Sequence, residues 1–319
     1  MRGISSRLFQ AEGNWARREE DWRPNVLSHQ WEDVEMKKHQ YDYKVVPYPK
    51  LRRLLSLMMG SVRRKHMIHG LIEVDVTKAH AHLRDYKAKT GESLSFTAFV
   101  TVCLAQAIDE NKSLQACRKG GKHLVLFDEV DVSTQIERDV AGHSQNITYI
   151  IRAANKKTFR EIHHEIRTAQ VEEVEQAWVA SHAFHWILFV PLVVFRCFWP
   201  IFWWMLGRYP QMQKKYRGTV GITAVGMFGK GAGWGIPIND HTLDVTLGGI
   251  GEKPGVADGQ IAIREYLSIT LSFDHDIIDG APAARFVQRL KDLIESSYGL
   301  DDSTFESEQV VAPVTSKKS

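Results

Sequence analysis

The sequence has few cysteines, little net charge and no apolar leader. Its three cysteines, Cys103, Cys117 and Cys197, are odd in number and irregularly spaced, which argues against a disulfide framework or a zinc site and indicates a reducing compartment. A net charge of +3 is too small to indicate nucleic acid as a partner. The charged start lacks the apolar core of a signal peptide. We therefore expect a cytoplasmic protein that binds no nucleic acid.

Glycines are numerous in one stretch but do not form a nucleotide-binding motif. Gly226, Gly229, Gly231, Gly233 and Gly235 are not followed by Lys-Ser/Thr and match no dinucleotide-binding spacing. We predict that they lie at strand ends and turns. Hydrophobic residues make up 44% and charged residues 25% of the 319 residues, which is typical of a globular protein.

Two polar segments flank the central part of the chain. Residues 1–44 are rich in charge but contain Trp15, Trp22 and Trp31, so we expect an N-terminal arm, part of which packs on something. Residues 301–319 are polar and predict a disordered tail.

A strand followed by a histidine is the most informative feature. Residues 267–273 alternate between apolar and hydroxyl side chains, the pattern of a strand with one buried face. His275 follows this strand, Asp279 lies four residues on, and Gly280 permits a backbone turn closed to other residues. A helix is predicted over 281–291. A rigid strand end is a common place for a reactive side chain.

A second predicted helix follows residue 158. Phe159, Ile162 and Ile166 give it an apolar stripe at helical spacing. His163 and His164 are adjacent and point to different sides of a helix, so they make a poor metal pair. We predict that both are solvated, and no metal site is expected in the chain.

The HxxxDG motif at 275–280 resembles that of the catalytic domain of dihydrolipoamide acyltransferases and of chloramphenicol acetyltransferase. A single histidine preceded by Asp274 favours the former. Further segments resemble the same domain in the same order: 46–55, 69–77, 95–108, 123–127, 130–134, 147–152 and 218–229. The resemblance implies an α/β fold over 45–300, an α+β two-layer sandwich with a mixed sheet.

The resemblance also implies a reaction and its residues. An acyl group would pass between a coenzyme A thioester and a thiol or hydroxyl, with His275 as the general base, because an imidazole with a pKa near 6.5 can accept a proton near neutral pH. Thr223 keeps the hydroxyl of the family's serine and would donate to the oxyanion. Asp279 would be mainly structural and pair with Arg52 or Arg53, and Gly280 would support the site.

The family further implies a homotrimer in which His275 of one subunit faces the Thr223 region of the next. No lipoyl domain is expected before residue 45, so a lipoyl group would come from a separate protein. Two positions depart from the family: Ala224 replaces an asparagine and Asp276 an arginine. They leave open an alternative, a non-catalytic trimeric scaffold or assembly protein.

An apolar insertion at 184–206 interrupts the resemblance. Its aromatic residues include Trp186, Phe195, Trp199, Phe202, Trp203 and Trp204. A single membrane crossing would separate the halves of one sheet, and Pro191, Arg196 and Pro200 interrupt a spanning helix. Four interpretations stay open: a hairpin dipping into one leaflet at the inner face of a membrane, contact with copies or a partner, the lining of an acyl pocket, or an extra buried layer.

Overall fold

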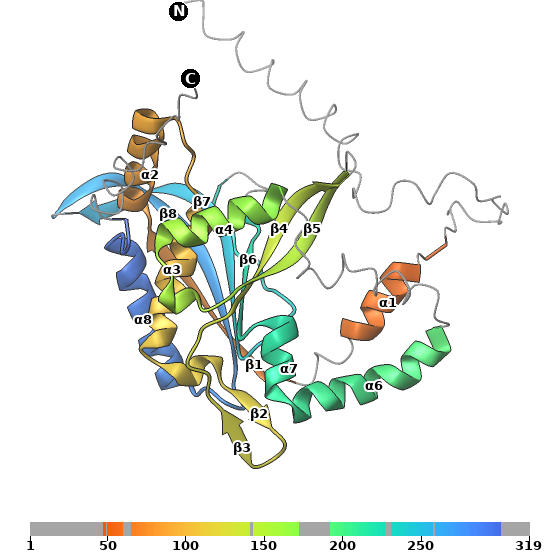
Figure 1. Ribbon diagram of the computed structural model, residues 1–319. Helices are drawn as coiled ribbons and strands as arrows, with labels where there is room; N and C mark the ends of the chain where they lie inside the picture. The colour runs from red at the N-terminus through yellow and green to blue at the C-terminus, as the bar shows by residue number, and fades with distance from the viewer. Residues whose placement is uncertain are drawn as a thin grey trace, which may run out of the picture.

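The computed structural model describes residues 47–48, 50–59, 65–140, 143–171, 192–226, 231–257 and 259–300. The arm at 1–44 and the tail at 301–319 therefore lie outside the described residues. Within the described residues, a six-stranded sheet is covered on one face by helices (Figure 1). The sheet strands are β1 (Met67–Asp75), β4 (Val132–Val140), β5 (His143–Ile151), β6 (Val220–Ala224), β7 (Leu243–Ala257) and β8 (Gln260–Asp274). The helices are α1 (Lys50–Met59), α2 (Thr77–Thr90), α3 (Phe96–Asp109), α4 (Phe159–Val171), α6 (Leu192–Arg208), α7 (Pro210–Arg217) and α8 (Gly280–Glu295).

The sheet is mixed, as the sequence predicts. Its order is β1-β8-β7-β6-β4-β5, and β6 is parallel to both β4 and β7 while the other pairs are antiparallel. A separate hairpin joins β2 (Cys117–Lys119) and β3 (His123–Val125). The predicted α/β class is confirmed.

Helix α3 lies at the centre of the core. Ser95 caps its N-terminus, where the hydroxyl oxygen accepts a hydrogen bond from the Ala98 amide at 3.2 Å. Phe99, Leu104 and Ile108 are fully buried, against α4, α8 and the covered face of the sheet. A helix that is apolar on nearly all sides belongs inside a protein.

Strands β7 and β8 form a ribbon that is longer than its neighbours. Each has 15 residues, and β1 pairs only with the last part of β8, from Tyr266 to Asp274. The rest projects from the sheet (Figure 1) and exposes Val256, Ile261 and Ile263. Three large aliphatic side chains on one free ribbon suggest a surface that meets another molecule.

Part of the apolar insertion forms helix α6, which has Pro200 in its interior. Trp199 is buried with its ring centroid 5.4 Å from that of Phe202, whereas Trp204 is exposed. Trp186 lies outside the described residues, as do the side chains of Phe195 and Trp203. Helix α6 contacts α1, α7 and β2 and lies away from the sheet (Figure 1). Among the helices that the structure describes, none combines the length and apolarity needed to cross a membrane.

Helix α4 confirms the predicted apolar stripe but corrects the prediction for one histidine. Phe159, Ile162 and Ile166 are buried, and so is His163, while His164 is exposed. The His163 ring lies between two hydrogen-bond partners, the Ser95 amide at 3.0 Å and the Glu92 carboxylate at 3.1 Å. These bonds satisfy both ring nitrogens, so the imidazole can be buried.

Candidate functional site

His275 stands directly after β8, as predicted. The backbone amide of Asp274 donates to the Thr242 carbonyl at 2.9 Å, and that of His275 donates to the His66 carbonyl at 2.7 Å. These two bonds fix the end of β8 to segments from both sides. The His275 side chain is 45% exposed, and its Nδ1 lies 3.7 Å from an Asp279 carboxylate oxygen. The imidazole is therefore accessible while its backbone is held.

The structure does not show the contacts that were expected to support the site through Asp279, Gly280 and the arginines of α1. Asp279 is the N-cap of α8, its side chain is 85% exposed, and in the described residues its ion-pair partner is His275. Arg52 and Arg53 are exposed on α1, which lies beside α6; the structure does not bring them to Asp279. Gly280 has no positive φ, and a Cβ there would meet no atom within 4 Å. The prediction that this position requires a glycine was therefore wrong, because any residue can adopt the helical backbone found there.

Asp276, the residue that reverses a charge next to His275, is paired. One carboxylate oxygen lies 2.9 Å from His66 Nδ1, and the other lies 3.1 Å from an Arg118 guanidinium nitrogen. The hydrogen bond from His66 lowers the pKa of Asp276, and the Arg118 charge lowers it further. Its negative charge is thus compensated by neighbours that the sequence motif did not identify.

A buried polar network supports the same end of the sheet. Lys65 Nζ donates to the carbonyls of Asp240 (2.9 Å) and His241 (2.7 Å) and lies 3.9 Å from buried Asp274. Burial lowers the pKa of Lys65. Burial alone would raise the pKa of Asp244, but the His241 ring at 2.7 Å and backbone amides lower it to about 2. These contacts rigidify the scaffold behind His275.

Thr223 lies on β6, far from His275 of the same chain. It pairs with Thr246, which pairs with Thr270 on β8. His275 is five residues beyond Thr270, so the two site residues are separated by roughly 17 Å along the strands and about 10 Å across them. The structure therefore does not bring Thr223 and His275 together in a single chain.

The row of three threonines lies on the sheet face opposite the helix-covered core. Ala224 packs against the core, and alternation places Thr223 on the other face. The hydroxyls of Thr246 and Thr270 are buried and have no hydrogen-bond partner within the described residues. Unpaired buried hydroxyls are uncommon, and because the chain itself covers Thr246 and Thr270, their position suits a buried water.

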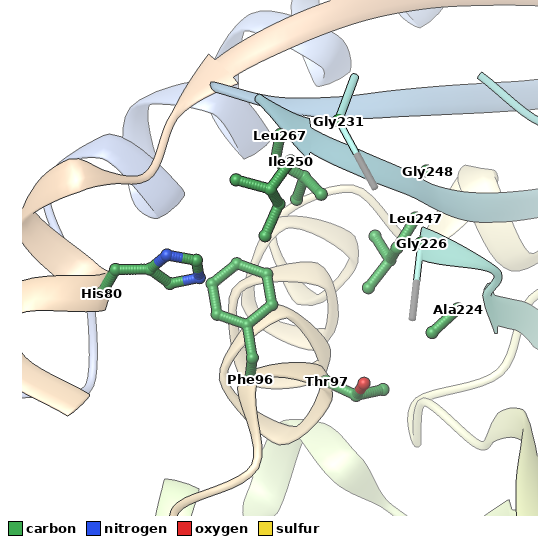
Figure 2. A pocket seen from close by; sticks show the side chains of 10 residues that line it. All are labelled: His80, Phe96, Thr97, Ala224, Gly226, Gly231, Leu247, Gly248, Ile250 and Leu267. Atoms are coloured by element: carbon green, nitrogen blue, oxygen red, sulfur yellow. The ribbon is translucent and has the colours of Figure 1, made fainter. Parts of the chain in front are cut away.

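A cavity of about 450 Å³ opens between the strands and two helices, and sequence reasoning did not identify it. Figure 2 shows the rings of His80 and Phe96 facing the side chains of Leu247, Ile250 and Leu267. His80 stacks edge-on against Phe96, with ring centroids 4.7 Å apart. Neither His275 nor Thr223 lines this cavity.

The cavity has a hydrogen-bonded histidine in its wall. His80 Nδ1 lies 3.2 Å from a Glu265 carboxylate oxygen, and Arg84 binds the other oxygen at 2.9 Å. Burial lowers the pKa of His80 although Glu265 opposes the shift. A neutral ring suits the apolar lining. Helix α2 gave no sequence signal for this role, because His80 and His82 stand among polar residues without a regular apolar stripe.

Comparison with protein families gives one clear match. The model described as "2-oxoacid dehydrogenases acyltransferase (catalytic domain)" matches residues 40–180 and 210–300. The unmatched stretch between them contains the insertion at 184–206.

Curated relatives carry related descriptions. The lipoamide acyltransferase component of the branched-chain alpha-keto acid dehydrogenase complex of Bacillus subtilis is 26% identical over 239 residues, which is 73% of this chain and 47% of the relative. The dihydrolipoyllysine-residue acetyltransferase component of the Zymomonas mobilis pyruvate dehydrogenase complex is 40% identical over 91 residues, 28% of this chain and 20% of the relative. The chain spans about half the length, or less, of these curated relatives.

Solved structures show the same fold. A probable dihydrolipoamide acetyltransferase from Listeria monocytogenes gives a TM-score of 0.57 at 21% identity, covering 80% of this chain and 96% of that one. The dihydrolipoamide acetyltransferase of Azotobacter vinelandii gives 0.58 at 18% identity, covering 81% and 94%. At these identities the likeness establishes the fold alone.

Proposed function

Because the chain belongs to the family of 2-oxoacid dehydrogenase acyltransferase catalytic domains, we propose that it is an acyltransferase that moves an acyl group between a coenzyme A thioester and a thiol or hydroxyl. The observation that carries this proposal is His275, an accessible imidazole whose backbone is hydrogen-bonded at the end of β8.

The A. vinelandii structure comes from work on the role of a serine, a histidine and an asparagine in that enzyme's catalytic mechanism. The separations of these three residues along that chain equal those of Thr223, His275 and Asp279 here. The match supports assigning the hydroxyl and imidazole roles to Thr223 and His275. Asp279 replaces an amide by a carboxylate, which suits it to interact with the His275 ring.

The separation between Thr223 and His275 supports a site shared between subunits. A hydroxyl roughly 17 Å along the sheet from the imidazole can take part only if it comes from another copy of the chain. The exposed ribbon residues Val256, Ile261 and Ile263 offer an apolar surface for such contact. A solved structure with the same fold is described as the cubic core of the pyruvate dehydrogenase multienzyme complex. We propose a homotrimer, in which each His275 meets the Thr223 region of its neighbour.

In the proposed reaction, His275 removes the proton from the acceptor thiol or hydroxyl as that group attacks the thioester carbonyl. The tetrahedral intermediate carries an oxyanion, to which the neighbouring subunit's Thr223 hydroxyl donates. Collapse of the intermediate breaks the carbon–sulfur bond. The proton on His275 then passes to the coenzyme A thiolate, which leaves as a thiol.

The surroundings of His275 also suit a phosphorylated carrier. Arg118 reaches Asp276 from the β2–β3 hairpin, and Lys119 and Lys122 are exposed on the same hairpin. Cationic side chains on one short hairpin attract phosphate groups. The pairing of Asp276 with Arg118 and His66 keeps its carboxylate from being an uncompensated charge beside an anionic substrate.

Thiol release from acetyl-coenzyme A, with dihydrolipoamide as acceptor, tests the proposal. His275→Ala should lower turnover by about 10²–10⁴-fold, the usual contribution of a positioned base, and should leave folding unchanged because the side chain is accessible. His164→Ala is the matched control, since His164 is an exposed histidine on α4. Equal turnover in both variants would disprove the role of His275. No transfer by folded wild type from acetyl, branched or longer acyl-coenzyme A would favour the non-catalytic scaffold instead.

A further inference from the structure

Helix α6 exposes an apolar face that the acyltransfer proposal does not use. Val194, Phe198, Ile201 and Trp204 recur at helical spacing and are 42%, 64%, 60% and 68% exposed. Trp199 points the other way and is buried. Exposed aromatic and aliphatic side chains in one continuous stripe indicate a surface with a binding partner.

The surroundings of this stripe carry charge of one sign. Between Glu175 and Asp240 the chain contains no acidic residue, although it has 38 in total. Arg196 and Arg208 are exposed on α6 itself. Helix α1, which contacts α6, exposes Arg52 and Arg53, and α7 exposes Lys215. Within the described residues, α6 and the elements that contact it, α1, α7 and β2, contain no Asp or Glu. An apolar helix face with cations and no acids on these elements is complementary to a bilayer, which is apolar in its interior and, with anionic lipids, negatively charged at its surface.

We propose that α6 docks the protein on the surface of a lipid bilayer that contains anionic lipids. The helix would lie in the plane of the membrane, with Phe198, Ile201 and Trp204 at the boundary between headgroups and acyl chains. Trp204 suits this depth because an indole is apolar but carries one donor. Arg196 and Arg208 would pair with lipid phosphates.

Other occupants fit the surface less well. In a symmetric contact between two copies of this face, Arg196 and Arg208 would meet cations of the same kind, with no acid on α6 to offset them. An acidic protein would satisfy the arginines but would leave the apolar stripe without an obvious match. An anionic bilayer satisfies both features. This docking surface stands independently of the proposed acyl transfer, because it involves none of the residues assigned to that reaction.

Flotation of the purified full-length protein with vesicles tests the inference. Wild type should float with vesicles of phosphatidylcholine and phosphatidylglycerol and should bind phosphatidylcholine vesicles about tenfold less strongly. Phe198→Ser combined with Trp204→Ser should lower binding to the anionic vesicles by about tenfold or more. The matched control is Leu71→Ser with Val171→Ser, two exposed apolar residues on β1 and α4.

The charge contribution has its own pair of variants. Arg196→Gln with Arg208→Gln should weaken binding to anionic vesicles and reduce its salt dependence. Lys87→Gln with Lys89→Gln, exposed on α2, should not. The inference is overturned if wild type does not float with anionic vesicles, if both apolar variants bind equally, or if the α6 variant instead lowers the oligomer mass in light scattering. Because binding is measured without turnover, an inactive enzyme would not affect the result.

Discussion

At the scale of single residues, a charge reversal next to the catalytic candidate has a local explanation. Asp276 stands beside His275 where the resemblance led us to expect an arginine, and it forms an ion pair with Arg118 and accepts a hydrogen bond from His66. The cationic charge is therefore present nearby but comes from other positions. The motif alone could not predict this, because both partners lie far away in the sequence.

Asp279 should contribute little to stability in the folded chain. We expect Asp279→Asn to change the free energy of unfolding by less than about 0.5 kcal/mol, because an exposed ion pair contributes little and the Asp279 side chain forms no capping hydrogen bond that could be lost. Asp131→Asn is the contrast: Asp131 is buried and its Oδ2 lies 2.8 Å from Arg152, so breaking that pair should cost about 3 kcal/mol. Urea unfolding measures both. A loss at Asp279 as large as that at Asp131 would indicate a buried partner for Asp279 in the assembly.

His163 should make stability depend on pH. Burial lowers its pKa below the ordinary 6.5, Glu92 opposes this shift, and Arg167 and Arg160 add to it. Just below pH 6.5 the unfolded chain therefore binds more protons than the folded chain. The free energy of unfolding then falls as the pH drops from about 6.5 towards the lower pKa of the folded state. The melting temperature of His163→Gln should fall less between pH 7 and pH 5 than that of wild type. His164→Gln, which alters an exposed ring, should retain the wild-type slope, and equal slopes for all three would contradict the assignment.

At the scale of helices and strands, the sequence predicted the elements whose apolar residues recur with a strong period. The alternation over 267–273 predicted the end of β8, and the apolar stripe of Phe159, Ile162 and Ile166 predicted α4. Helix α2 was missed because it buries only Ala79 fully and has almost no apolar stripe. Strand β7 was missed because glycines and Pro254 interrupt its pattern. Its pairing with β8, a tertiary effect, overrides those local signals.

Gly226, the first of the glycines predicted at strand ends and turns, follows β6 and allows close backbone packing, whereas Gly229 lies outside the described residues. A Cβ on Gly226 would overlap the carbonyl of Gly248 on β7, so no side chain fits without moving a strand. Gly226→Ala should destabilise the protein by on the order of 2 kcal/mol and disturb the cavity that Gly226 lines. Gly121→Ala is the control, because a Cβ there would meet nothing within 4 Å. Thermal unfolding compares the two, and an unchanged Gly226→Ala variant would show that β6 and β7 can separate at no cost.

At the scale of the whole molecule, the site predicted from the sequence is incomplete in one chain. Thr223 and His275 can be named from motifs, but only the strand register shows that they are far apart. The same register leaves the hydroxyls of Thr246 and Thr270 without partners within the described residues. The separation of Thr223 from His275 is expected if the site is shared between subunits, whereas the chain itself covers Thr246 and Thr270. A motif gives the residues of such a site but not the distance between them, which depends on the strand register.

Complementation between inactive variants tests this shared site. Thr223→Ala and His275→Ala should each lower turnover by at least about 10²-fold. When the two are mixed and subunits exchange, about one quarter of the interfaces should join an intact His275 to an intact Thr223, because each subunit contributes a different half of the site to each neighbour. Activity should therefore return to about a quarter of the wild-type value. A mixture of His275→Ala with the double variant should stay inactive. Light scattering should show the mass of a trimer. A monomeric mass would contradict the shared site, and so would subunit exchange that does not restore activity.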